Sequence, residues 1–176
     1  MGAQVSGSQA QFWIFSLDLY GDSDVRKSCL HLQDAFGADV NMLLWCCHCA
    51  WDFGRICETP ELEAIDLSLK QWREDMLIPL RSLRKKASVD RVFYEALKAA
   101  ELEGERYAQN LIVNSISAAD EQGLISQGTR LSYAHQSLRN YLVGYLGLSD
   151  GKVSEVIATL LSGLSRLSNE HPVPSA

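Results

Sequence analysis

DVNMLLWCCHCAWDFG, residues 39–54, is the stretch that decides the fold. Asp39 is a natural cap for the start of a helix, and Gly54 is a natural residue for its end. Between Val40 and Phe53 apolar residues occupy nearly all sides of the helix that this stretch would form. A helix that is apolar all round is normally buried at the centre of a bundle. The stretch therefore predicts a central helix that other helices cover.

Amphipathic helical patterns lie on both sides of this stretch. Their apolar stripes are Phe12, Phe15 and Leu19; Val25, Cys29, Leu32 and Phe36; Leu62, Ile65, Leu69, Trp72 and Met76; Phe93, Leu97, Ala100, Gly104, Tyr107 and Leu111; Leu131, Ala134, Leu138, Tyr141 and Tyr145; and Val153, Val156, Leu160, Leu164 and Leu167. The predicted cap residues are Asp22 or Ser23, Thr59, Ser88, Thr129 and Asp150. Pro79 is expected to kink or break its helix. The predicted fold class is all-α, a compact single-domain bundle of about six or seven helices.

The chain length bounds the number of domains. At 176 residues the chain is long enough for one core and short for two. Small polar residues open the sequence, and two prolines stand near its end. We therefore expect a flexible arm over residues 1–9, a helical domain over 10–167 and a disordered tail over 168–176.

Charge and cysteine usage exclude several functional classes. The net charge of −6 disfavours binding to nucleic acid or to an anionic membrane surface. The basic cluster between Lys70 and Lys98 fits the solvated side of a helix or, alternatively, an anion site. Five cysteines inside apolar stretches are typical of a reducing compartment, so we expect a cytoplasmic protein. Residues 1–6 match the N-myristoylation pattern at Gly2, and lipidation there stays open.

The run Cys46-Cys47-His48-Cys49, with Cys57 after it, contains atoms that bind zinc. On one helix only residues three or four apart share a face. Cys46 and Cys49 could therefore act together as ligands from one face, whereas Cys47 and His48 point elsewhere. Small buried cysteines are ordinary core residues. The sequence thus favours the core interpretation, and we expect no metal and no cofactor.

Several polar residues stand where apolar ones are expected. Asn41, His48 and Asp52 form a polar strip on the central helix, which must be satisfied by partners in the fold or by a ligand. Two acidic pairs, Asp34 with Asp39 and Glu101 with Glu105, resemble metal-binding carboxylates, but their spacing favours a helix cap and arginine partners. We find no catalytic grouping. The candidates for a polar network or a binding site are Gln33, Asp34, Asp39, Asn41, His48, Asp52, Arg73, Arg81, Arg84, Glu101 and Glu105.

Several runs resemble one protein family. They are Phe12-Trp13 with Phe15-Ser16-Leu17, Cys29-Leu30 with Leu32-Gln33-Asp34, Gly37-Ala38-Asp39-Val40-Asn41 with Leu43-Leu44, Trp72-Arg73, Pro79-Leu80-Arg81 with Arg84, and Glu101 with Glu105-Arg106. The sequence resembles, over roughly residues 10–115, a family of short conserved proteobacterial proteins that form a domain of unknown function. The resemblance implies a bacterial cytosolic protein and supplies no activity.

Two functional hypotheses follow. The first is a non-enzymatic helical interaction module, an adaptor or a homodimer, because Leu30 lies beside Gln33 and Asp34 on a second face of its helix. Its partner would be another protein or a second copy of the chain, without nucleic acid or a membrane. The second is an enzyme or carrier that binds an anionic or isoprenoid-like small molecule between helices, near Asn41, His48 and the arginines.

Overall fold

A computed structural model describes residues 7–115 and 125–170, and this part of the chain is helical with no strand. The elements are α1 (Gly7–Gly21), α2 (Ser23–Phe36), α3 (Val40–Asp52), α4 (Thr59–Trp72), the π-helical η1 (Arg73–Leu77), α5 (Ile78–Lys86), the 3-10 turn η2 (Ala87–Val89), α6 (Arg91–Asn114), α7 (Gln127–Arg139), the π-helical η3 (Asn140–Tyr145) and α8 (Asp150–Glu170). Because η1 joins α4 to α5 and η3 extends α7, these elements form seven helical rods in the described part of the chain. The predicted all-α bundle is confirmed.

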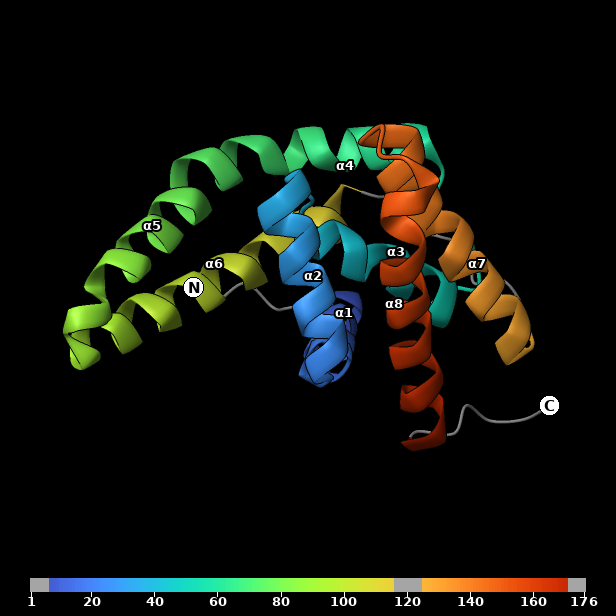
Figure 1. The fold of residues 1–176 in the computed structure, drawn as a ribbon, viewed down its shortest axis with the longest axis horizontal. Helices are drawn as coiled ribbons and strands as arrows, with labels where there is room; N and C mark the ends of the chain where they lie inside the picture. The colour runs from blue at the N-terminus through green and yellow to red at the C-terminus, as the bar shows by residue number, and fades with distance from the viewer. Residues whose placement is uncertain (1–6, 116–124, 171–176) are drawn as a thin grey trace.

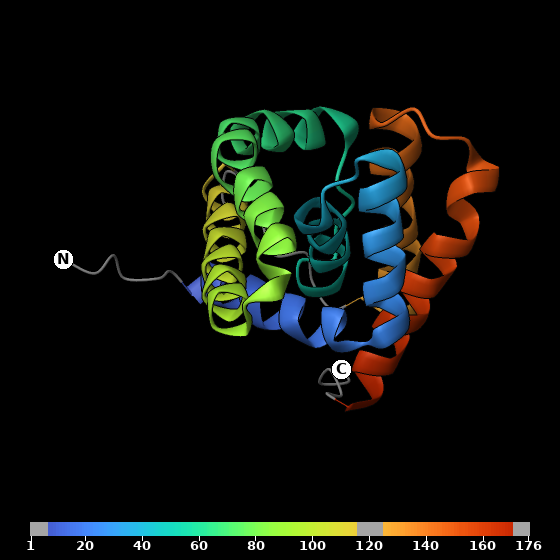
Figure 2. The same cartoon turned by 60° about the vertical axis from the view of Figure 1, so that its left-hand side comes forward.

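The central helix predicted from the sequence is α3. Every residue from Asn41 to Trp51 is buried. Figure 2 shows α3, in teal, in the middle of the molecule with the other helices around it. It contacts α1, α2, α6 and α7. The Asp39 side chain caps its N-terminus by accepting a hydrogen bond from the Asn41 amide, as predicted.

Some predicted helix starts are confirmed and others are wrong. Asp22 caps α2, and Gly37 closes it at φ 70°. Helix α6 is capped by Asp90, not Ser88, because Ser88 lies in the 3-10 turn and the Asp90 carboxylate accepts from the Phe93 amide. Glu58 replaces Thr59 as the cap before α4, and Ser126 replaces Thr129 before α7. Asp150, also predicted as a cap, is the first residue of α8 itself.

Pro79 does not break its helix. The π-helical turn η1 precedes it, and the Ile78 amide donates to the Arg73 carbonyl five residues back. This wider turn accommodates the proline ring, which would crowd the preceding turn of a regular helix. Figure 1 shows the rod changing direction between α4 and α5, so the expected kink is present. Met76, predicted in the apolar stripe, is exposed.

Helices α5 and α6 form a hairpin that extends away from the other helices, as Figure 1 shows in green and yellow. No residue of α5 is buried, and α6 is buried only from Gly104 onward. Of the apolar stripe predicted for α6, only Gly104 is buried. The buried face of α6 consists of Gly104, Ala108, Gln109 and Ile112. A methyl group added at Gly104 would meet the Leu77 side chain, so the helix lies close to its neighbour there.

The ends of the chain lie largely outside the described residues. This holds for the predicted arm over residues 1–9, for the tail over 168–176 and for Gly2. Within the described part α1 begins at Gly7 and α8 continues to Glu170. Among the described residues, no helix has both the length and the apolar character needed to cross a membrane.

Candidate functional site

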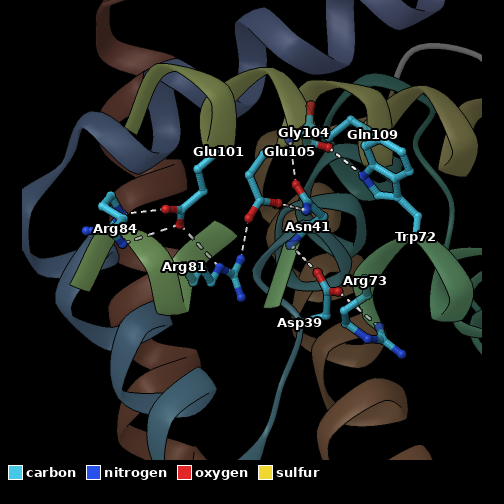
Figure 3. A network of polar contacts seen from close by, with 10 residues as sticks. All are labelled: Asp39, Asn41, Trp72, Arg73, Arg81, Arg84, Glu101, Gly104, Glu105 and Gln109. Atoms are coloured by element: carbon cyan, nitrogen blue, oxygen red, sulfur yellow. Dashed lines mark hydrogen bonds and ion pairs between the residues drawn. The ribbon is translucent and has the colours of Figure 1, made fainter. Parts of the chain in front are cut away.

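A network of polar contacts begins at the N-terminus of α3. Asp39 caps the helix with one carboxylate oxygen, 2.8 Å from the Asn41 amide, and its other oxygen lies 3.1 Å from Nη1 of Arg73. The Asp39 amide donates to the Tyr141 hydroxyl at 2.8 Å. A single residue thus joins α3 to η1 and η3. Figure 3 shows Asp39 and Arg73 side by side.

Arg73 extends the network toward α4. Its Nη1 atom donates to Oδ1 of Asp66 at 2.8 Å, and the Tyr145 hydroxyl donates to Oδ2 of the same carboxylate at 2.8 Å. Burial and the hydrogen bond to Asp66 both act on Arg73, and the net effect raises the pKa of its guanidinium. Asp66 was missed by sequence reasoning, because a lone polar residue on an amphipathic helix normally faces solvent. Tyr145 was predicted only as a member of an apolar stripe.

The hairpin contributes four charged side chains to the network. Nε of Arg81 lies 3.3 Å from Glu101, and its Nη2 pairs with Glu105. Arg84 pairs with the same Glu101 through Nε and Nη2. The predicted pairing of these glutamates with arginines is confirmed. It ties α5 to α6 through two-pronged contacts that suit the planar guanidinium group.

Asn41 connects the hairpin pairs to the core. Its side-chain amide donates to Oε2 of Glu105, and its oxygen accepts from Gln109 at 3.0 Å. Gln109 also donates to the Ser16 hydroxyl at 3.0 Å, which brings α1 into the network. Gln109, Asn41 and Ser16 are all buried. Burial raises the pKa of Glu105, the Asp39 charge raises it further, and Arg81 opposes both.

The remaining predicted residues lie apart from this network. Asp34 is exposed on α2, and Gln33 beside it is half-buried. Nδ1 of His48 lies 2.7 Å from the Asp52 carboxylate, at the other end of α3. The buried imidazole packs among the rings of Phe12, Phe15, Trp45 and Phe53. The predicted polar strip is thus divided, with Asn41 in the network and His48 in an aromatic cluster.

All five cysteines are free and buried. The Cys57 sulfur lies within 4.8 Å of the Cys49 sulfur. Hydrogen bonding with Cys46 and Cys49 lowers the pKa of Cys57, while desolvation raises the pKa of Cys46 and of Cys49. The sequence placed Cys46 and Cys49 on one face, and the structure adds Cys57 from the connection to α4.

The network is a set of interhelical pairs, not a row of unpaired donors. Arg73, Arg81 and Arg84 each contact at least one carboxylate. Polar groups that satisfy one another in this way fix the relative position of helices, at the cost of their own desolvation. The fold and site together define an all-α bundle protein whose central helix is joined to a protruding hairpin by hydrogen bonds of Asn41 to Glu105 and Gln109, and whose hairpin is held together by partly buried ion pairs.

The chain belongs to the family described as Protein of unknown function (DUF2390), whose model matches residues 11–112. This span contains every charged member of the network, from Asp39 to Glu105. The resemblance to a domain of unknown function is therefore confirmed. A comparison with curated proteins found no match, and a comparison with solved structures found none either.

Proposed function

We propose that the chain is a cytoplasmic, non-enzymatic interaction module that binds an acidic, partly apolar segment of a partner protein at the end of its hairpin. The binding surface, called here the hairpin tip, is made by residues 83–93. The observation that carries the proposal is the exposure of large apolar side chains there. Val89 is 94% exposed, Val92 83%, Phe93 54% and Leu83 48%. Grouped apolar side chains on a surface mark interaction sites.

Charge around the tip selects the kind of partner. Residues 83–93 contain four basic residues and one acidic one, in a chain whose net charge is −6. The single acidic residue, Asp90, is used as the cap of α6. Lys85, Lys86 and Arg91 are exposed around the apolar residues. A basic rim around an apolar centre complements a segment with acidic and apolar residues, and it accelerates their encounter.

The network supports this proposal by holding the hairpin in place. Arg81 and Arg84 fasten α5 to α6, and Trp72 Nε1 donates to the Gly104 carbonyl at 2.9 Å where the hairpin joins the bundle. A surface that is already ordered loses less conformational entropy when a partner binds. The pairing of these arginines with carboxylates also favours this function over an anion-binding enzyme or carrier. The five free cysteines support a reducing, cytoplasmic location.

Site-specific photocrosslinking in cells tests the proposal. A photoreactive amino acid replaces Val92 in the full chain, and in a matched control it replaces Leu67, which is 74% exposed on α4. We expect adducts from position 92 and none from position 67. The crosslinked partner peptide should be acidic, and Lys85→Glu with Lys86→Glu should remove most of the adduct.

Three results would contradict the proposal. An adduct of twice the chain mass would show self-association in place of a separate partner. Flotation of the purified chain with vesicles of anionic lipid, lost in the charge-reversed variant, would show that the tip faces a membrane. A small molecule retained by the wild-type chain in native mass spectrometry would favour the enzyme or carrier hypothesis.

A further inference from the structure

Two cysteine sulfurs and one carboxylate meet beside the central helix. Cys46 and Cys49 lie one turn apart on α3, and Cys57 follows in the connection between α3 and α4. The sulfurs of Cys49 and Cys57 and a carboxylate oxygen of Glu61, in the first turn of α4, all lie within 4.8 Å of one another. Three potential ligands thus converge from three consecutive segments, and Cys46 stands one helical turn before Cys49 on the same face of α3.

We propose that Cys46, Cys49, Cys57 and Glu61 bind one zinc ion as a structural site. Zinc in such sites takes four ligands in tetrahedral geometry, with Zn–S distances of about 2.3 Å. Two sulfurs on one zinc ion are therefore about 3.8 Å apart, so a shift of about 1 Å or less would bring the Cys49 and Cys57 sulfurs to that separation. Cys46, on the same face of α3, would supply the fourth ligand by turning its side chain toward the ion. Three thiolates and a carboxylate leave no position for water, as in other structural sites.

Neighbouring groups already orient two of the ligands. Arg55 holds both oxygens of Glu61 at 2.7 Å, and each oxygen keeps a second lone pair for a metal ion. The Cys57 amide donates to Ser137 at 2.9 Å, and its carbonyl accepts from Asn140 at 2.8 Å. Supporting hydrogen bonds of this kind fix the ligands of metal sites. A zinc ion with three thiolates and one carboxylate has two excess negative charges, and the positive charge of Arg55 offsets one of them.

Burial determines how such a site would act. Cys46, Cys49 and Cys57 are each 0% exposed, so the ion enters when the chain folds or opens locally, and its binding energy stabilises the fold. The ion would join the C-terminal half of α3, remote from Asp39, to the start of α4. The other two cysteines, Cys29 and Cys47, are buried outside this group and supply matched controls.

The test measures zinc in the full chain, purified under reducing conditions without a histidine tag. Native mass spectrometry after addition of one equivalent of Zn²⁺ should show one ion per chain in the wild type and in Cys29→Ser. Cys57→Ser should bind none. Glu61→Gln should bind zinc at least about tenfold more weakly. Even the loss of a residue that only supports a metal ligand usually weakens metal binding by about that factor. A chelator should lower the thermal midpoint of the wild type and leave that of Cys57→Ser unchanged.

A second measurement removes the dependence on a folded variant. Co²⁺ added to the reduced wild-type chain should give the intense near-ultraviolet sulfur-to-cobalt absorption of a site rich in thiolates, and Zn²⁺ should displace it. Absence of this absorption, or a wild-type chain that binds no zinc, would overturn the proposal. Equal zinc binding by Cys57→Ser and the wild type would overturn it as well.

Discussion

Replacing Arg81 with Met tests whether the network stabilises the fold. Arg81 stands between Glu101 and Glu105, and its side chain is 23% exposed. Methionine keeps most of the apolar stem and removes the guanidinium group. Glu105 then retains Asn41 as its hydrogen-bond donor in the network but loses its cation. The variant therefore leaves a largely buried carboxylate without charge compensation.

The expected loss follows from the burial of the pair. Removing one partner of a fully buried ion pair costs about 3 to 5 kcal/mol. Because water reaches about a fifth of the Arg81 and Glu105 side chains, screening reduces the expected loss to about 2 to 4 kcal/mol. For a domain of this size that corresponds to a thermal midpoint lower by about 5 to 15 °C.

The pH dependence of this loss has a definite sign. The pKa of Glu105 is already raised by burial and by Asp39, and loss of Arg81 raises it further. A carboxyl group whose pKa is higher in the folded than in the unfolded chain binds its proton more tightly in the folded state. Acidification through that folded-state pKa therefore restores stability. We expect the difference between Arg81→Met and the wild type to be smaller at about pH 5 than at about pH 7.5.

Urea unfolding followed by tryptophan fluorescence measures these differences. Arg91→Met, at an exposed position, is the matched control and should cost less than about 0.5 kcal/mol. Adding Glu105→Gln to Arg81→Met should recover part of the loss, because the stranded charge is gone. If Arg81→Met costs no more than the Arg91 control at either pH, the network does not stabilise the fold.

Three other substitutions test the packing, each by urea or thermal unfolding. Leu44→Ala in the central helix should cost about 2 to 5 kcal/mol, and a loss below about 0.5 kcal/mol would mean that α3 is not the centre of the core. Gly163→Ala should cost about 1 to 3 kcal/mol because the new methyl group meets Val25, whereas Gly151→Ala, with nothing within 4 Å, should cost nothing; equal effects would contradict the close approach of α8 to α2. Asp39→Asn, which keeps a helix-capping acceptor, should be less destabilising than Asp39→Ala by about 0.5 to 2 kcal/mol, and identical losses would show that the cap contributes nothing.

The sequence predicted the parts of the fold that depend on a strong local signal. The apolar run after Asp39 is a central helix, and Asp22 and Gly37 bound α2, because caps and fully apolar helices have few alternative structures. The buried face of α6 was predicted correctly only at Gly104. Its contacts are made by small residues such as Gly104 and Ala108, which carry little hydrophobic signal, while the larger Phe93 is exposed.

The candidate site was predicted in part. The pairing of Glu101 and Glu105 with arginines follows from charge and helical spacing, and the structure confirms it. Asp66 and Gln109 were missed because nothing local distinguishes a polar residue that meets a partner far along the chain from one that faces water. Gln33 was named as a candidate for the same reason, because the sequence does not show which polar residues have partners far along the chain. Whether any of these residues bind a partner stays a prediction.

The π-helical turn η1 has a consequence for how the family varies. A regular helix turns about 100° per residue, so Arg73 and Arg81, eight positions apart, would point about 80° away from each other. One extra residue in the π-helical turn reduces this angle to about 20° and lets both arginines face the network. A family member with one residue fewer between them has a regular helix there and keeps both arginines on that face. We therefore expect family members that lack one residue at this point to have a regular helix in place of the π-helical turn and to retain both arginines.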